Sequence, residues 1–270
     1  CPSKNSRTSC GKQVFRKPGG DVIGRRRLDT HFLALRALGA TLEYDGALQL
    51  RAPKGLVGTD IMLDEASVTA TQNAIMAAAR ARGTTILRNA ASEPHIQDLC
   101  ACLTAMGARI ENAGTNTVII HGAETLKGCE FTVGADNIEV TSFIVLGALR
   151  GDGIRIRDAC VRDLRMTAMT LERIGIRFNI DGNDVVVPGG QRLEVEPDFG
   201  GSIPTIADSP WPGFPADAMS LAVVAATQSN GTVLIHEKMF ESRLYFVDKL
   251  IAMGARIVLC DPHRCLVQGI

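Results

Sequence analysis

Three stretches of the 270-residue sequence combine residue types that could do chemistry. Asp21 follows a Gly-Gly pair, and an aspartate, ionised at its ordinary pKa of about 3.9, serves as a general acid only where the protein raises that pKa. Arg26 and Arg27 open a polar run, and guanidinium groups suit phosphates because their donors form a charged fork. Ser67 precedes an apolar run, and the N–H groups of a helix's first turn are a ready site for anions.

The same residues also have purely structural interpretations. Asp21 fits an ordinary turn after two glycines. The arginines fit a solvated basic run at a helix start with Asp29 as its N-cap, and Ser67 fits the N-cap of a second helix. Asp217, a further candidate that precedes the apolar run 218–226, fits the N-cap of a third helix. Residue types alone leave both interpretations open, so the elements that hold these residues have to be considered.

The composition argues against several classes of protein. Lys plus Arg and Asp plus Glu both total 29, and a net charge of zero argues against nucleic-acid or membrane-surface partners. A hydrophobic fraction of 46% predicts a packed core, and no apolar run approaches the ~20 residues of a membrane span. The polar start lacks a signal-peptide core, which predicts a cytoplasmic protein. Eight cysteines at spacings that fit no zinc site predict reduced, mostly buried thiols and no metal.

An internal repeat organises the chain. A short motif that ends an apolar helix at a glycine occurs four times, with the glycines at positions 39, 107, 175 and 254. A glycine followed by a strand-like run lies upstream of each copy, at positions 11, 83, 153 and 231. Four copies spaced 68, 68 and 79 residues apart predict an α/β fold built from one repeated unit.

The second copy shows what this unit contains. Thr85–Arg88 is typical of a strand, and the apolar side chains of the next helix recur at steps of three and four. These side chains are Ile96, Leu99, Leu103 and Met106. The pattern continues with a hairpin of two short strands, a strand at Glu130–Val133 and a helix at Thr141–Leu149. The unit is therefore β-α-β-α-β-β, with apolar helices that lie inside, covered by sheets.

The domain boundary follows from the spacing of the copies. Val133–Asn137 falls between the second and third copies, which predicts a first domain over residues 1–133 and a second over residues 134–270. The last spacing is eleven residues longer than the others because of Pro197–Pro215. This proline-rich stretch predicts a long loop of the kind that often carries function.

With these residues laid out, the sequence resembles the UDP-N-acetylglucosamine enolpyruvyl transferase family from about Phe15 to the C-terminus. The resemblance rests on Pro18–His31, Asn89–Asp98, Phe214–Asp217 and Met239–Arg243, in that order. It implies two inside-out α/β domains of three β-α-β-α-β-β units each, of which this chain holds about four of six. It also implies that the enolpyruvyl group of phosphoenolpyruvate moves to the 3′-hydroxyl of UDP-N-acetylglucosamine, the step that opens peptidoglycan synthesis, without a metal or organic cofactor.

The resemblance gives roles to individual residues. Asp21 stands where most members carry a cysteine that the epoxide antibiotic fosfomycin alkylates, and it is implied to protonate the methylene carbon of phosphoenolpyruvate. Asp217 is implied to take the proton of the 3′-hydroxyl. The residues implied to contact the substrates are Arg26, Arg27, Leu28, Asp29, Thr30, His31, Ser67, Val68, Met239 and Arg243.

The sequence departs from the family pattern at several places. Arg27 replaces a proline, and Glu65 replaces a lysine where a negative charge would repel a diphosphate. Six units of 68 residues need roughly 410 residues, so the chain is expected to be incomplete at both ends and inactive as a transferase by itself.

Two other interpretations stay open. A relative with the same six-unit fold, 5-enolpyruvylshikimate-3-phosphate synthase, is the enzyme alternative, although the Gly-Gly-Asp loop favours the nucleotide-sugar enzyme. A binding remnant or repeat scaffold without catalysis is the alternative from another class, and Arg27 and Glu65 favour it. The sequence does not predict the oligomeric state.

Overall fold

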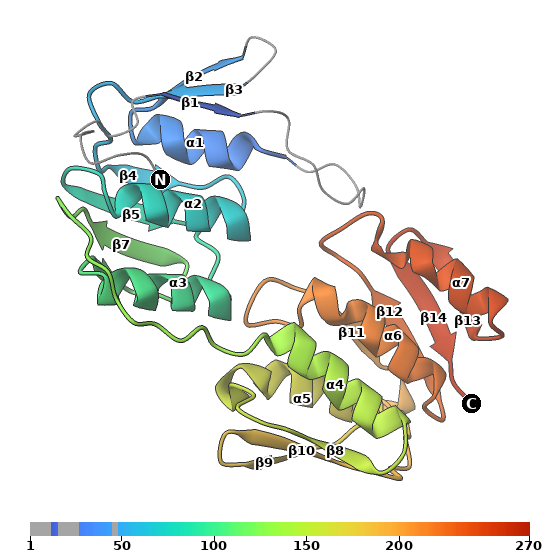
Figure 1. Cartoon of the computed structure of the whole chain (residues 1–270). Helices are drawn as coiled ribbons and strands as arrows, with labels where there is room; N and C mark the ends of the chain where they lie inside the picture. The colour runs from blue at the N-terminus through green and yellow to red at the C-terminus, as the bar shows by residue number, and fades with distance from the viewer. Residues whose placement is uncertain (1–11, 16–26, 45–47) are drawn as a thin grey trace. The chain divides into compact units, whose positions relative to one another are not determined.

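The computed structural model describes residues 12–15, 27–44 and 48–270 of the chain (Figure 1). The chain divides into two compact units, Cys1–Val133 and Gly134–Ile270, and each unit has a hydrophobic core of its own.

The described part of the first unit contains two sheets. The antiparallel sheet has the order β1-β3-β2 and consists of β1 (Lys12–Phe15), β2 (Thr41–Tyr44) and β3 (Leu48–Arg51). The second sheet has the order β4-β5-β7-β6 and consists of β4 (Asp60–Met62), β5 (Thr84–Arg88), β6 (Arg109–Glu111) and β7 (Thr117–His121). The helices are α1 (Asp29–Ala37), α2 (Val68–Ala78) and α3 (Pro94–Ala105), and α2 packs against both of the others.

The second unit also contains two sheets. The antiparallel sheet has the order β8-β10-β9 and consists of β8 (Gly153–Ile156), β9 (Asn179–Asp181) and β10 (Asp184–Pro188). The other has the order β11-β12-β14-β13 and consists of β11 (Thr205–Ala207), β12 (Thr232–His236), β13 (Arg256–Asp261) and β14 (Arg264–Gln268). The α-helices are α4 (Asn137–Leu149), α5 (Arg165–Glu172), α6 (Met219–Thr227) and α7 (Val247–Ala252). The short 3₁₀ helices are η1 (Val161–Leu164), η2 (Phe199–Gly201), η3 (Ala216–Ala218) and η4 (Arg243–Phe246).

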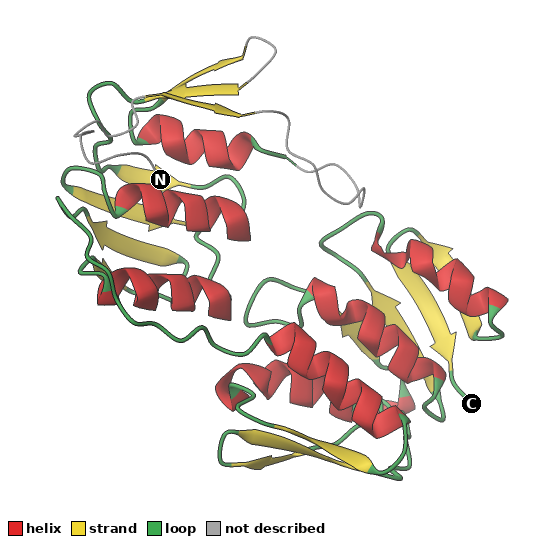
Figure 2. Ribbon diagram, in the orientation of Figure 1, coloured by secondary structure: helices red, strands yellow, loops and turns green. Residues whose placement is uncertain are grey.

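The two four-stranded sheets confirm the predicted α/β repeat. Elements β4-α2-β5-α3-β6-β7 follow the order β-α-β-α-β-β, and β11-α6-β12-α7-β13-β14 follow it again (Figure 2). In each sheet the first strand is parallel to the second, and the remaining pairs are antiparallel. The glycines that follow the four repeated helices have φ of +97°, +103°, +84° and +97°, in the left-handed region that favours glycine: Gly39, Gly107, Gly175 and Gly254.

One predicted strand does not form. Glu130–Val133 has no strand partner within the described residues, and Phe131 and Val133 are 37% and 77% exposed. A strand needs both a hydrogen-bonding partner and an apolar face to bury, and this segment has neither. The third copy therefore begins at α4, whose N-cap Asp136 accepts hydrogen bonds from the backbone N–H groups of Ile138 and Glu139.

The proline-rich stretch Pro197–Pro215 is also more regular than predicted, because it contains η2 and β11. β11 pairs in parallel with β12 and so becomes the edge strand of its sheet. The sequence that follows β11 leads through a turn into η3, which holds Asp217.

The apolar helices lie inside to different degrees. α6 buries Ala222, Val223 and Ala226, as predicted, whereas α4 buries Ile144 but leaves Phe143 41% exposed.

The six cysteines in the described ranges are free thiols, but only Cys100 and Cys265 are buried, so the prediction of mostly buried thiols is wrong. Among the helices that the structure describes, none is both long and apolar enough to cross a membrane.

Candidate functional site

Two of the predicted site residues, Asp21 and Arg26, lie outside the described residues, and their roles stay predictions from the sequence. The structure places the other ten in two clusters, one in each unit.

The first cluster lies where α1 begins. Thr30 is buried, and its hydroxyl donates to Asp64 Oδ1 at 2.7 Å, while Arg27 Nη2 donates to Asp64 Oδ2 at 3.1 Å. Arg27 Nε also donates to Asp29, at 3.3 Å. The Thr30 hydroxyl and the Arg27 charge lower the pKa of Asp64, and Asp29 with Asp64 raises the pKa of Arg27. The guanidinium of Arg27 is therefore shared between two carboxylates of its own chain.

His31 links α1 to α2. The amide nitrogen of Asn73 lies 2.8 Å from His31 Nδ1, and Thr69 Oγ1 lies 3.3 Å from His31 Nε2. Because the amide nitrogen only donates, Nδ1 accepts, and Nε2–H is left to donate to Thr69. Burial lowers the pKa of His31, so the neutral ring ties the two helices together at neutral pH.

The start of α2 favours the structural interpretation of Ser67. Ser67 is the N-cap, with φ −74° and ψ 124°, and its hydroxyl accepts from the Ala70 N–H at 3.4 Å. Val68 is the first helical residue. At α1, by contrast, the N-cap is Leu28, so the interpretation of Asp29 as the cap is wrong. The Asp29 carboxylate lies in the first turn and pairs with Arg27 instead.

The second cluster contains Asp217, Met239 and Arg243. Arg243 Nη2 forms an ion pair with Asp217 Oδ1 at 2.5 Å, and its guanidinium lies over the Phe240 ring, 4.7 Å from the centroid. The Arg243 side chain is 22% exposed, and its buried Nε has no hydrogen-bond partner among the described residues. The Asp217 side chain is 64% exposed. An exposed carboxylate held by a half-buried arginine can accept a proton from a hydroxyl group.

Asp217 does not cap α6. It lies in η3, and the N-cap of α6 is Ala218, which makes no side-chain capping bond. The capping alternative is therefore wrong.

The sequence interpretation missed a residue that supports this cluster. Asp208, fully buried after β11, accepts hydrogen bonds from the backbone N–H groups of Lys238 at 2.5 Å and Met239 at 3.2 Å. It fixes the segment that connects Met239 with Arg243. The sequence did contain a signal for the burial of Asp208. Residues two apart on a strand face the same side, and Asp208 comes two residues after Ile206, which faces the core.

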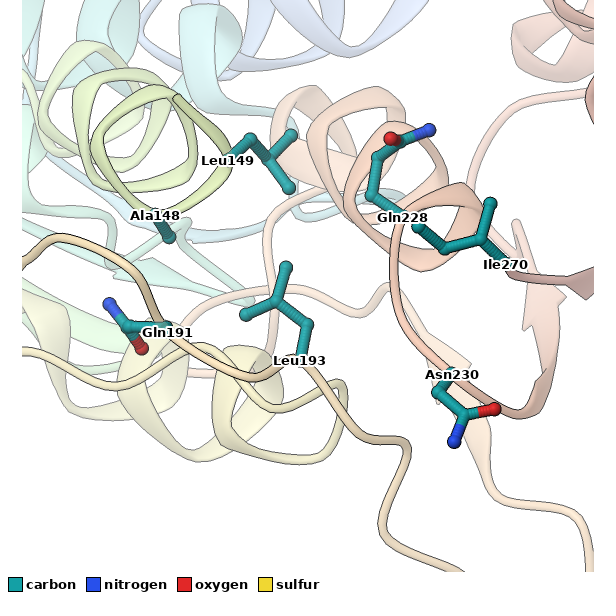
Figure 3. Close-up of a pocket in the computed structure, with 7 residues that line it drawn as sticks. All are labelled: Ala148, Leu149, Gln191, Leu193, Gln228, Asn230 and Ile270. Atoms are coloured by element: carbon teal, nitrogen blue, oxygen red, sulfur yellow. The ribbon is translucent and has the colours of Figure 1, made fainter. Parts of the chain in front are cut away.

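A pocket in the second unit contains none of the candidate residues (Figure 3). Its lining residues are Ala148, Leu149, Gln191, Leu193, Gln228, Asn230 and Ile270. None of them is titratable, and the Gln191 amide already donates to the backbone oxygens of Arg177 and Pro188. The lining supplies no acid, base or phosphate-binding cation.

Comparisons with known proteins show the family to which the chain belongs. The family model described as EPSP synthase (3-phosphoshikimate 1-carboxyvinyltransferase) matches residues 6–264. The UDP-N-acetylglucosamine 1-carboxyvinyltransferase of Bradyrhizobium diazoefficiens is 56% identical over 260 residues, and that of Treponema denticola is 56% identical over 259 residues. Each of these alignments covers 96% of this chain, but only 60% and 61% of the respective relative.

Solved structures agree on the fold. The enolpyruvyl transferase NikO from Streptomyces tendae matches with a TM-score of 0.79 at 25% identity, over 96% of this chain and 60% of that one. An EPSP synthase from Acinetobacter baumannii matches with a TM-score of 0.66 at 18% identity, with the same coverage, which shows the fold alone. The predicted enolpyruvyl transferase fold is confirmed.

Proposed function

Because the chain belongs to the EPSP synthase family, we propose that it takes part in transferring the enolpyruvyl group of phosphoenolpyruvate to the 3′-hydroxyl of UDP-N-acetylglucosamine, with release of phosphate. The observation that carries this proposal is the 56% identity, over 96% of the chain, to enzymes named UDP-N-acetylglucosamine 1-carboxyvinyltransferase. The proposal places the chain in peptidoglycan synthesis, with two small-molecule substrates, in the cytoplasm.

The second cluster supports the chemical step. Asp217 is exposed and paired with Arg243, so its carboxylate is held in place and reachable. It takes the proton of the sugar 3′-hydroxyl as that oxygen bonds to the substituted carbon of phosphoenolpyruvate. Asp21, assigned from the sequence, adds a proton to the methylene carbon. Loss of a proton from that carbon and of phosphate from its neighbour then restores the double bond.

The first cluster supports binding of the nucleotide. The N-terminus of α2 presents backbone N–H groups, which favour anions, and Arg27 is hydrogen-bonded to Asp64, four residues before this helix begins. Glu65 and Asp64 oppose a diphosphate there, whereas the Ser67 cap and the His31 links to α2 keep the terminus in a fixed geometry. We therefore assign Arg27–His31, Ser67 and Val68 to the nucleotide.

A chimera tests the proposal directly. Residues 6–264 replace the matching stretch of the Bradyrhizobium diazoefficiens enzyme, and phosphate release is followed with phosphoenolpyruvate and either UDP-N-acetylglucosamine or shikimate 3-phosphate. The expected result is phosphate release only when phosphoenolpyruvate and the nucleotide sugar are both present. Phosphate release with phosphoenolpyruvate and shikimate 3-phosphate, but not with the nucleotide sugar, would support the 5-enolpyruvylshikimate-3-phosphate synthase alternative. A folded chimera that binds the nucleotide sugar without turnover would support the binding remnant.

A further inference from the structure

The second unit holds two buried carboxyl groups that no sequence motif explains. Asp208 follows β11 and Glu237 follows β12, and both are 0% exposed. The parallel strands pair Ile206 with Ile235, and two more residues in the same register set Asp208 beside Glu237. Side chains two residues apart on a strand share a face, so both carboxyl groups lie on the core side, with the two isoleucines.

The sister repeat shows that the fold does not need carboxyl groups at this place. There the parallel strands β4 and β5 pair Ile61 with Leu87, and the corresponding positions hold Leu63 and Asn89. Leu63 is buried, and the Asn89 amide donates to its backbone oxygen at 3.0 Å. A leucine and an amide thus complete the same strand pair, so the pairing of the strands does not itself require two acids.

Asp208 holds the segment that follows β12. Its two oxygens accept from the backbone N–H groups of Lys238 and Met239, at 2.5 and 3.2 Å. On the other side, the Glu237 N–H donates to the His263 oxygen at 2.8 Å, and His263 Nδ1 lies 2.9 Å from the Glu237 oxygen. The backbone is therefore fixed at the start of the segment that leads to Arg243.

The Glu237 carboxyl group has no close hydrogen-bond donor among the described residues. Neither carboxyl oxygen has a hydrogen-bond partner in the described structure, and the neighbouring Asp208 is an acceptor as well. Asp208 has two backbone donors, but two ionised carboxylates buried side by side still repel each other, and a single proton between them removes this repulsion and gives Glu237 a hydrogen-bond partner. Burial raises the pKa of Glu237 to about 8, and Asp208 adds to the rise. The charge of Arg243 in η4 and the backbone N–H of Phe240 oppose this rise, and His263 faces only the Glu237 backbone.

We propose that Glu237 holds one proton at neutral pH and donates it as a hydrogen bond to Asp208, so that the pair positions the segment 238–243 with its substrate-contact residues Met239 and Arg243. The two acids are positioning residues and touch no substrate. Once Glu237 ionises, the repulsion loosens the segment, and affinity for the nucleotide sugar falls. Only this last consequence rests on the proposed function.

Infrared spectroscopy of the full 270-residue chain tests the shared proton. The C=O band of a buried protonated carboxyl group is followed from about pH 5 to about pH 10 in the wild type, Glu237→Gln and Glu241→Gln, whose carboxyl group is exposed on the same segment. The wild type and Glu241→Gln are expected to show the band at pH 7 and to lose it with a midpoint near the Glu237 pKa of about 8. Glu237→Gln is expected to lack the band at every pH. A wild-type chain without the band at pH 7 overturns the proposal.

Amide hydrogen exchange tests the positioning. Protection of the Lys238 and Met239 amides is expected to fall about 10-fold or more in Asp208→Asn, which weakens the acceptor. In the wild type the same protection falls as pH rises past about 8, and in Glu237→Gln, which keeps a neutral donor, it does not. Protection that is independent of pH in the wild type overturns the positioning role, even if Asp208→Asn does not fold.

Binding of UDP-N-acetylglucosamine to the chimera with the Bradyrhizobium diazoefficiens enzyme, with and without the substitutions, separates this proposal from the proposed function. The dissociation constant is expected to rise about 10-fold between pH 7 and pH 9 in the wild type and to stay level in Glu237→Gln. If the infrared band and the exchange behave as expected while the nucleotide sugar binds at no pH, the positioning pair is supported and the proposed function fails. A wild-type affinity that does not change with pH, in a chain that binds, overturns the coupling.

Discussion

Arg243 shows how one side chain can serve several purposes in the second cluster. Its guanidinium pairs with Asp217 and lies over Phe240, and its buried Nε has no hydrogen-bond partner in the described part of the chain. Arginine is suited to this combination because its planar group stacks and donates in a fixed fork. The ion pair holds the Asp217 carboxylate in one place although that side chain is 64% exposed.

The first prediction concerns Asp217 as the base. In the active chimera, Asp217→Asn is expected to lower kcat by about 10²-fold or more, because an amide cannot take the hydroxyl proton. KM for the nucleotide sugar is expected to change little, since the amide still forms hydrogen bonds. Steady-state phosphate release measures both, with Asp248→Asn, an exposed aspartate of α7, as the matched control. Equal losses in the two variants would contradict a catalytic role.

The second prediction concerns Asp21, which lies outside the described residues. A carboxylate is a weak nucleophile toward an epoxide, whereas a thiol with a pKa near 8.5 is readily activated as the thiolate. The chimera is therefore expected to resist alkylation by fosfomycin, and Asp21→Cys is expected to gain one covalent adduct. Mass spectrometry of the loop peptide measures the adduct. An adduct at Asp21 itself would show that this carboxyl group is more reactive than proposed.

At the scale of elements, the N-terminus of α2 combines stability with proposed binding. The third prediction is that Ser67→Ala lowers the free energy of unfolding of the first unit by about 1 kcal/mol, because the Ala70 N–H loses its acceptor. Urea unfolding measures this loss, and Thr59→Ala, an exposed side chain of the same unit, serves as the control. An unchanged stability would mean that the 3.4 Å cap contributes nothing measurable.

Elements with local signals were predictable from the sequence. A glycine after a helix adopts a positive φ because of its own chemistry, so Gly107 and Gly254 mark helix ends wherever the rest of the chain lies. The strand expected at Glu130–Val133 failed for the opposite reason, because a strand depends on a partner from elsewhere in the chain.

The candidate site was predictable only in part, for a similar reason. The family motifs pointed to Arg27, Asp217 and Arg243, and the structure shows Asp217 paired with Arg243. The buried acids Asp208 and Glu237 were missed because each looks like a polar residue at a strand end. Their inward phase is visible in each strand separately, but only the parallel pairing of β11 with β12 brings them together.

At the scale of the whole molecule, the two units have separate hydrophobic cores. A chain with two independent cores need not unfold in one step. The expected behaviour is two transitions, in which Leu87→Ala lowers the stability of the first unit and Ile235→Ala that of the second, each by about 2–5 kcal/mol. Leu87 and Ile235 occupy matching strand positions in the two repeats, so each substitution is the control for the other.

The last prediction combines these two cores with the titration of Glu237. Its pKa rises from an ordinary 4.5 to about 8 in the folded chain, so between these values the folded second unit holds a proton that the unfolded chain has lost. The free energy of unfolding of that unit therefore falls as pH rises, by about 1.4 kcal/mol per pH unit within the window, and levels off above it. Relative to Glu237→Gln, this slope is expected in the transition of the second unit and not in that of the first. Urea unfolding at closely spaced pH values measures it, with Glu241→Gln expected to follow the wild type. A slope shared by both transitions would mean that the two units unfold as one, and a slope that Glu237→Gln retains would assign the proton to another group.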